Sequence, residues 1–304
     1  MLRHAALIAA VFIALYGPHL VIAWGNDGHQ IAAMVADHFL SARARSAIDV
    51  LLNPKGKQGT RPLATIADIA SWADGVKRPG TCWAWTRNYH YIDTNDDVAS
   101  YQCSYDDSRD CAYMQCLTGA ITFFTSKLSP HCAGSSSRSF GTHRFFIVHF
   151  VPEIHQPLHV TSRARGGNDI PVRFDGRATN LHAVWDGKML LKSLRDRHQT
   201  TAERAAELIR HLGNLWVHNL SKWNLEIDLA MTNANGNLVV AAQWAAEANQ
   251  RGCEAVFPLL DDGAHELNHD YYASAEPMLN FFLAQAGYRL AMWLNNAFEC
   301  QEVE

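Results

Sequence analysis

The sequence predicts an all-α protein, a single compact helical domain with one short β-hairpin. Apolar residues recur at spacings of three and four along most of the chain, which is the period of an amphipathic helix. Strand patterns are sparse, and 48% hydrophobic residues with 18% charged residues are typical of a chain that folds around a core. A length of 304 residues suits two average domains or one large one. Because we find no internal repeat, we expect one domain.

The first residues have the pattern of a secretory signal peptide. An apolar stretch over residues 5–16 is followed by Val21-Ile22-Ala23, which carries the small residues that a signal peptidase prefers. The alternative is a retained membrane anchor, but a spanning helix needs roughly 20 apolar residues, and Pro18 interrupts this run. We therefore expect residues 1–23 to be removed, residues 24–304 to form the domain, and the protein to be secreted or held in an endomembrane lumen.

Helical periodicity begins at Ile31, continues to His38, and returns between Ile66 and Val76, where it stops before Pro79. Further helices are expected at about 114–128, 139–155, 200–219, 238–252 and 276–298.

Local signals define some of the boundaries. Thr200 and Glu203 have the spacing of a capping box, and Pro277 is expected near the start of the last helix. The run Ile170–Phe174 alternates like a strand and is followed by the turn dipeptide Asp175-Gly176. These residues predict the short β-hairpin.

The last helix is apolar enough to raise the question of a membrane span. Asn280, Gln285 and Arg289 interrupt the apolar run. We expect a packed helix in a protein without a membrane anchor, and a monomer.

The charge and the histidine content indicate metal chemistry. The net charge of −4 argues against binding duplex nucleic acid through a basic face, but it is compatible with a nucleic acid held by metal ions and stacking. The chain has 16 histidines, and the neutral imidazole is the commonest metal ligand in proteins.

Two histidine–carboxylate pairs have i, i+4 spacing, His149 with Glu153 and His182 with Asp186. On a helix this spacing places both side chains on one face, within reach of one ion, and nitrogen and oxygen ligands suit zinc. For one pair alone, a salt bridge on a solvated face is the alternative. Because His149 lies in the apolar run Phe145–Val151, an unpaired imidazole there would be costly to bury. Metal binding is therefore favoured.

Other candidate ligands stand in aromatic or glycine-rich surroundings. Asp74 ends an amphipathic helix, and His90 lies in an aromatic segment. His159 follows a proline that ends the preceding helix, so we expect it to point away from the first pair. After cleavage, Trp24 would offer a free amine and a carbonyl beside the imidazole of His29. Six other histidines, at 38, 131, 143, 155, 265 and 269, are expected to be at the surface or locally hydrogen-bonded.

Taken in order, these segments resemble the secreted trinuclear-zinc nuclease and 3′-nucleotidase family of fungi, plants and trypanosomatids. The resemblance runs through nearly the whole mature chain and implies the helical scaffold of the zinc phospholipase C and zinc nuclease type. The motifs that carry it are Trp24…His29, Ser71-Trp72-Ala73-Asp74, His90-x-x-Asp93, Val148-His149-Phe150, Gln156-Pro157-Leu158-His159, Gly166-Gly167-Asn168, Asn180-Leu181-His182-x-x-Trp185-Asp186 and Gly287-Tyr288-Arg289-Leu290-Ala291.

The resemblance implies three Zn²⁺ ions. The family usually has Asp at the position of Glu153, which here is one methylene longer. We expect Glu153 still to bridge two ions; the alternative is that it alters their spacing and affinity. The implied ligands are Asp74, His90, His149 and Glu153 for one ion, His159, His182 and Asp186 for a second, and the Trp24 amine and carbonyl, His29 and again Glu153 for a third.

The resemblance also implies disulfides between Cys103 and Cys253 and between Cys111 and Cys116. Cysteines of a secreted chain are more readily disulfide partners than metal thiolates. Asn219 begins a glycosylation sequon. No partner is assigned for Cys82, Cys132 and Cys300.

The implied activity is endonucleolytic cleavage of single-stranded DNA and RNA to 5′-phosphorylated products, with hydrolysis of 3′-mononucleotides. A hydroxide bridging the two zincs that share Glu153 would attack phosphorus. Lys77 would stabilise charge in the transition state, or would be a solvated lysine near a helix end. Tyr91 would stack on a base, or would be core packing. Asp93 would accept from the base edge, with Asn168 nearby.

Two alternatives share the expected metal chemistry. A zinc phospholipase C has a related scaffold and a Trp N-terminus but cleaves a lipid phosphodiester. A secreted zinc-binding relative without catalysis is the other, with Glu153 as the mark of lost activity. The residues Tyr91 and Asp93 favour the nuclease.

Overall fold

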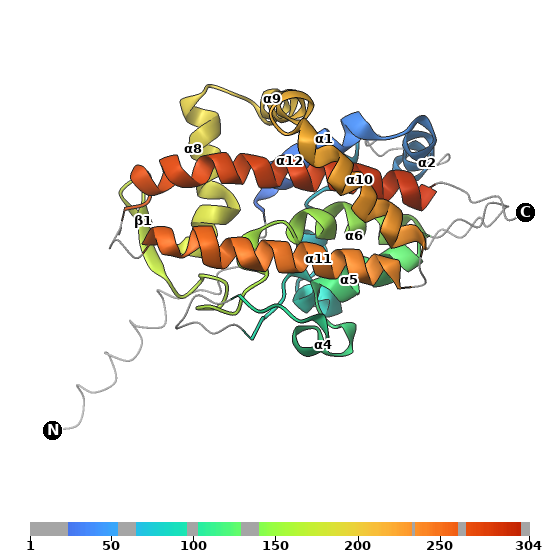
Figure 1. Ribbon diagram of the computed structural model, residues 1–304, viewed down its shortest axis with the longest axis horizontal. Helices are drawn as coiled ribbons and strands as arrows, with labels where there is room; N and C mark the ends of the chain where they lie inside the picture. Colours follow the sequence, from blue (N-terminus) through green and yellow to red (C-terminus); the bar gives the residue numbers. More distant parts are fainter. Residues whose placement is uncertain are drawn as a thin grey trace, which may run out of the picture.

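The computed structural model describes residues 24–53, 65–95, 103–128, 140–232, 235–260 and 266–298. The expected signal peptide, Cys132, Cys300 and two of the remaining histidines, His131 and His265, lie outside these ranges. Within them the chain is all-α apart from one antiparallel hairpin, as predicted (Figure 1). None of the helices in these ranges is both long and apolar enough to cross a membrane.

The helices run through the chain with short connections. The α-helices are α1 (Asn26–Phe39), α2 (Ala42–Leu52), α3 (Trp72–Val76), α4 (Asp107–Asp110), α5 (Leu117–Ser126), α6 (Phe140–Glu153), α7 (Leu181–Ala183), α8 (Met189–Asp196), α9 (Thr201–Asn214), α10 (Val217–Thr232), α11 (Gly236–Arg251) and α12 (Asp270–Phe298). The single 3₁₀ or π turns are η1 (Ile66–Ile69), η2 (Ala84–His90), η3 (Ala112–Met114), η4 (Pro157–His159), η5 (Val184–Lys188), η6 (Gly252–Val256) and η7 (Pro258–Leu260).

Helix α12 runs along the long axis of the molecule and packs against α1, α6, α9 and α10 (Figure 1). Its contact with α1 is close at Gly287, where an added Cβ would lie 2.6 Å from the carbonyl oxygen of Ala32. Only a glycine permits this approach of two helix backbones. The approach places α1, and with it His29, against the middle of the fold.

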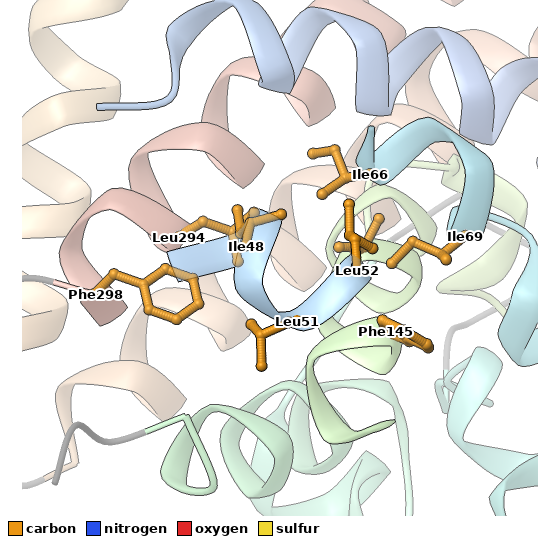
Figure 2. Close-up of a pocket in the computed structure, with 9 residues that line it drawn as sticks. Ile48, Leu51, Leu52, Ile66, Ile69, Phe145, Leu294 and Phe298 are labelled. Carbon is orange, nitrogen blue, oxygen red and sulfur yellow. The ribbon is translucent and has the colours of Figure 1, made fainter. Parts of the chain in front are cut away.

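Helix α6 crosses the interior and carries the first histidine–carboxylate pair. Phe146, Ile147 and Phe150 on this helix are completely buried and pack with α5 and η2. A small apolar pocket lies on another side of α6, beside Val148 (Figure 2). The pocket is lined by Ile48, Leu51, Leu52, Ile66, Ile69, Phe145, Val148, Leu294 and Phe298, none of which can donate or accept a side-chain hydrogen bond. It therefore belongs to the packing of α2 and α12 and is no candidate for a polar substrate.

The hairpin and the disulfides agree with the expectations. Strand β1 (Pro171–Phe174) pairs antiparallel with β2 (Arg177–Asn180). Asp175 and Gly176 between them have φ of 51° and 69°, which is the backbone of a two-residue hairpin turn. The structure confirms both implied disulfides, Cys103–Cys253 and Cys111–Cys116, and leaves Cys82 exposed as a free thiol.

Two predicted helices are interrupted in the structure. The helix expected over 66–76 is divided into η1 and α3, because Ser71 leaves the helical backbone conformation with φ of −98° and ψ of 7°. The carbonyl of Ala70, just before it, accepts a hydrogen bond from the His149 ring. The helix expected over 200–219 ends at Asn214, and α10 begins at Val217. Trp216 lies in this break and packs against Phe281 of α12, which turns the chain. The capping box of Thr200 with Glu203 is present.

The last helix begins earlier than expected. Helix α12 starts at Asp270, so Pro277 lies inside it and not near its start. A contact with a distant residue stabilises the first turn of α12. Tyr271 in this turn is buried, and its hydroxyl accepts a 2.7 Å hydrogen bond from the Trp185 indole. Helices α2 and α8 were not predicted.

A buried arginine links helices α10, α11 and α12. Arg289 on α12 is 1% exposed, and its guanidinium forms ion pairs of 2.7 Å with Glu226 and 2.8 Å with Glu247. The rings of Trp223 and Trp244 lie over the same guanidinium, 5.6 Å and 5.2 Å from its central carbon. The positive charge holds the pKa of the Glu247 carboxyl below its ordinary value, against the rise that burial would produce.

Replacing Arg289 by Met should destabilise the protein by roughly 3 to 5 kcal/mol, because two largely buried carboxylates would lose their counter-charge. Urea unfolding of the full chain measures the change. Arg251→Met is the matched control: Arg251 and Glu254 form a pair that is about half exposed, so its loss should cost less than about 1 kcal/mol. Equal stabilities of the two variants would contradict the prediction.

Candidate metal centre

Glu153, the last residue of α6, is completely buried and lies among histidines from its own helix and from three other elements. His149 precedes it by one helical turn, as the i, i+4 spacing predicts. The other imidazoles come from positions far away in the chain: His29 on α1, His90 at the end of η2 and His159 at the end of η4. The fold thus brings four imidazoles together around one carboxylate, although these histidines are spread over 131 positions of the sequence.

One oxygen of Glu153 faces a first group of ligands. The Oε1 atom lies 2.6 Å from His149 Nε2, 3.2 Å from His90 Nδ1 and 3.6 Å from His29 Nε2. Asp74 on α3 completes the group, with Oδ1 3.6 Å from His90 Nδ1 and 3.7 Å from His149 Nε2. Nitrogen and carboxylate oxygen atoms at these separations can converge on a divalent metal ion.

The other oxygen of Glu153 faces a second group. Its Oε2 lies 2.6 Å from His159 Nδ1, and the opposite nitrogen of that ring is 3.3 Å from Asp186 Oδ1. Asp186 Oδ2 is 3.1 Å from His182 Nε2. The expectation that His159 points away from the first pair is therefore wrong. The chain turns at Gln156 and returns through η4, which brings the His159 ring back to the end of α6.

Several of these buried nitrogens have no hydrogen bond. His29 is completely buried, and neither of its ring nitrogens has a partner. The Nε2 atoms of His90 and His182 are also buried and without a hydrogen bond. Buried polar atoms are nearly always satisfied, so these free nitrogens fit a candidate site for a cation.

Backbone carbonyls orient two of the imidazoles. His149 Nδ1 is 2.8 Å from the carbonyl oxygen of Ala70, and His182 Nδ1 is 2.6 Å from that of Gly166. When each Nδ1 donates its proton to a carbonyl, Nε2 keeps a free lone pair that faces the neighbouring carboxylates. This is the orientation that metal-binding histidines show in proteins.

The charges of the metal-free site are strongly coupled. Burial would raise the pKa of Glu153, but His159 and His149 hold it well below its ordinary value. Burial would lower the pKa of His159, yet the charge of Glu153 raises it to about 10. For His90, burial prevails and lowers the pKa to about 3. The charge of Glu153 therefore favours the protonated form of His159.

Lys77 is not a solvated lysine. Its side chain is 8% exposed, and its ammonium lies 2.6 Å from Asp74 Oδ1. The charge of Lys77 contributes to the lowered pKa of Asp74, together with His149 and against the effect of burial. A fixed cation therefore stands at the edge of the first group of ligands.

Trp24 lies beside both groups. Its side chain is completely buried, and the indole donates a 2.9 Å hydrogen bond to the carbonyl of Pro152, next to Glu153. The amide of Gly25 donates to the carbonyl of Asp186 at 2.6 Å. The segment that would become the mature N-terminus is thus anchored against the candidate ligands.

The residues expected to hold a base lie at the edge of the second group. Ile92, between Tyr91 and Asp93, donates its amide to the carbonyl of His159 at 2.8 Å. Tyr91 is half-buried rather than part of the core, and Asp93 is exposed. Asn168 is half-buried and donates to the carbonyl of Arg165 at 2.8 Å.

Two supporting residues were not predicted as part of the site. Gln156 donates a 2.7 Å hydrogen bond to Asp186 Oδ1 and accepts one from the amide of Leu158. His155 is buried and bonds locally to Val151, as expected, but its other nitrogen is 3.1 Å from Arg289. Gln156 belongs to the motif Gln156-Pro157-Leu158-His159, so the sequence did indicate this residue. The residues around His155 in the sequence give no indication of its contact with α12.

Comparison with known proteins agrees with this geometry. The profile of the S1/P1 nuclease family matches residues 24–299. The chain belongs to the S1/P1 nuclease family. It is 32% identical to Nuclease S1 of Aspergillus oryzae over 295 residues, which cover 95% of this chain and 96% of that protein.

Two further relatives extend the comparison across kingdoms. Nuclease P1 of Penicillium citrinum is 32% identical over 280 residues, or 90% of this chain and 97% of that protein. Endonuclease 4 of Arabidopsis thaliana is 31% identical over 287 residues, or 91% of this chain and 90% of that protein. As an S1/P1 nuclease, this chain is a phosphodiester hydrolase of a metal-dependent family, with candidate ligand clusters in place.

If the second group binds a divalent metal ion, binding should release protons at pH 7, because the charge of Glu153 raises the pKa of His159 to about 10 and a histidine must lose its proton to become a ligand. The apparent affinity of that site should rise about tenfold per pH unit between pH 6 and pH 8. Calorimetry of chelator-stripped protein in buffers of different ionisation enthalpy counts the protons. His159→Gln should release about one proton fewer, and an affinity independent of pH would refute this assignment.

Proposed function

We propose that this protein is a zinc-dependent endonuclease that hydrolyses single-stranded DNA and RNA to 5′-phosphorylated products, and that it also removes phosphate from 3′-mononucleotides. The observation that carries the proposal is the buried Glu153, whose Oε1 lies within 3.6 Å of His149 and His90, the proposed ligands of one ion, and of His29, a proposed ligand of another. A single carboxylate placed in this way can hold neighbouring ions a few ångströms apart, as phosphate-cleaving sites with several metals require.

We assign three Zn²⁺ ions to this centre. The first group described above, without His29, would hold one ion, and the second group would hold another. A third ion would take His29, which has no hydrogen bond, and the amine and carbonyl of Trp24. The ligands are Asp74, His90, His149 and Glu153 for the first ion, His159, His182 and Asp186 for the second, and Trp24, His29 and Glu153 for the third.

Bound zinc would supply a water of lowered pKa near neutral pH and would neutralise charge on the phosphate. The protein residues have separate tasks. Glu153 stays ionised while buried, because the surrounding imidazoles lower its pKa, and it therefore keeps the charge that a bridging ligand needs. Lys77, held by Asp74, would place its ammonium toward a negatively charged phosphoryl group.

Single-strand preference would come from Tyr91. Stacking on an aromatic ring requires an unpaired base and contributes about 1–3 kcal/mol. Tyr91 is half-buried beside His159, with Asp93 one residue beyond Ile92. Asp93 would accept a hydrogen bond from the base edge, and Asn168 lies on the neighbouring loop.

The third ion would depend on processing. Trp24 has a free amine only when residues 1–23 have been removed, so the proposal includes cleavage of a signal peptide and a mature domain of residues 24–304. We further propose passage through the secretory pathway, to the outside or to an endomembrane lumen, with glycosylation at Asn219. The mature enzyme would act as a monomer.

Chelation should abolish release of 5′-mononucleotides from single-stranded DNA, and added zinc should restore it. Glu153→Gln should lower the rate by more than about 100-fold and reduce the bound zinc, because the bridging charge is removed. The rate assay and metal analysis by mass spectrometry are run on processed protein beginning at Trp24. Glu254→Gln, on an exposed residue of η6, is the control and should leave both values unchanged.

A processed protein that holds zinc but does not cleave single strands would overturn the proposal. Full activity of the Glu153→Gln variant would overturn the bridging role alone.

Replacing Tyr91 by Ala should raise KM for a single-stranded oligonucleotide by roughly five- to 150-fold, the range that corresponds to loss of one stacked base. The zinc content should not change, because the ring of Tyr91 is outside both ligand groups. Steady-state kinetics on single-stranded and duplex DNA measure the effect. An unchanged KM would show that Tyr91 is not a stacking platform.

A further inference from the structure

The loop between η4 and β1 has an unusual backbone. Ala164, Arg165, Gly166 and Gly167 all have positive φ, at 48°, 55°, 63° and 80°. Glycine adopts this left-handed conformation readily, but residues with a Cβ do so rarely. Two successive residues with side chains in this conformation persist only where the surrounding structure imposes it, and such positions cluster at functional sites.

The loop is attached directly to the metal centre. The carbonyl of Gly166 is the hydrogen-bond partner of His182 Nδ1 at 2.6 Å. A Cβ on Gly166 would lie 2.5 Å from the carbonyl oxygen of Leu158, so the loop is pressed against η4. The carbonyl of Arg165 in turn accepts the side-chain amide of Asn168 at 2.8 Å. The backbone of Arg165 is therefore held in place directly before Gly166, whose carbonyl orients the candidate ligand His182.

The segment of Tyr91 and Asp93 flanks the same ligand group from the other direction. Ile92 bonds to the backbone of His159 at 2.8 Å, and the rings of His159 and His182 stack with centroids 5.2 Å apart. Partial desolvation raises the pKa of the Asp93 carboxyl, and the charge of Arg165 opposes this rise. The loop of Arg165, bonded to His182, and the segment of Tyr91 and Asp93, bonded to His159, thus flank one stacked pair of histidines.

The side chain of Arg165 is available to a ligand. It is 74% exposed, and its Nη1 has an exposed contact of 3.2 Å with Asp169, which water and salt weaken. A guanidinium presents paired N–H donors that match the oxygens of a phosphate. A rigid loop that holds such a group beside a nucleotide site is suited to a strand that continues past the site.

We propose that Arg165 binds a backbone phosphate of the single strand other than the phosphate that is cleaved, next to the nucleotide held at Tyr91. This inference rests on the proposed function and extends its substrate-binding surface. A 3′-mononucleotide has no such phosphate, so Arg165 distinguishes polynucleotide from mononucleotide substrates. It also supplies a localised cation to a protein whose net charge is −4.

The test compares Arg165→Ala and Arg165→Lys with the control Arg195→Ala. Arg195 is a close match, since its side chain is 57% exposed and contacts Asp175 at 3.0 Å. Binding of a fluorescently labelled single-stranded oligonucleotide to chelated protein is followed by anisotropy over a series of salt concentrations. KM values of the zinc enzyme are then measured for the unlabelled oligonucleotide and for a 3′-mononucleotide.

For Arg165→Ala we expect binding of the oligonucleotide to weaken about fivefold at low salt, and the slope of log K against log salt to become shallower by about 0.7, the value for one phosphate contact on a single strand. KM for the oligonucleotide should rise similarly, while KM for the mononucleotide should not change. Arg165→Lys should retain the salt slope, and Arg195→Ala should behave like the wild type.

Unchanged oligonucleotide binding and salt slope in Arg165→Ala would overturn the inference. An equal rise of KM for both substrates would also overturn it, because the loop would then act through His182. The binding experiment in the presence of chelator tests the role of Arg165 independently of catalysis. If the zinc-loaded wild type did not hydrolyse the oligonucleotide, the proposed function would be wrong, but the result for Arg165 would still stand.

Discussion

The buried carboxylate of Glu153 is the constraint on which the rest of the structure depends. A charge in the interior is costly unless other groups compensate it, and here four imidazoles approach its two oxygens within 3.6 Å. Each imidazole is delivered by a different part of the chain, so α1, η2, α6 and η4 must meet at one point. The long helix α12 and the close contact at Gly287 hold α1 in the position that this meeting requires.

A second layer of contacts gives the ligands their directions. The carbonyls of Ala70 and Gly166 accept from His149 and His182, and Gln156 holds Asp186. These contacts lie where regular structure is interrupted, since Ala70 ends η1 and Gly166 belongs to a left-handed loop. Local irregularity is therefore the means by which helices present side chains to a common centre. Behind this layer, Arg289 ties the end of α6 to α11 and α12 through His155 and Glu247.

The distribution of charge reconciles a net negative protein with a polyanionic substrate. Positive charge is concentrated at the centre itself, in the proposed metal ions and in Lys77. Tyr91 and Arg165 would then add stacking and one phosphate contact at the edge. A substrate held in this way needs little of the basic surface that duplex-binding proteins use, and it needs bases that are free to stack.

The helical class, the hairpin and the two i, i+4 pairs could be predicted from the sequence, because each depends on spacing within one element. His149 and Glu153 meet at 2.6 Å for this reason alone. The ordered motifs indicated the other candidate ligands and both disulfides through their resemblance to a family, although no local rule predicts them. Only the tertiary structure decided that His159 returns to Glu153, that the carbonyl of Ala70 accepts from the His149 ring, and that Arg289 contacts His155 across 134 positions. These contacts join distant segments, and hydrophobic periodicity carries information about neighbours along one helix but none about which helices meet.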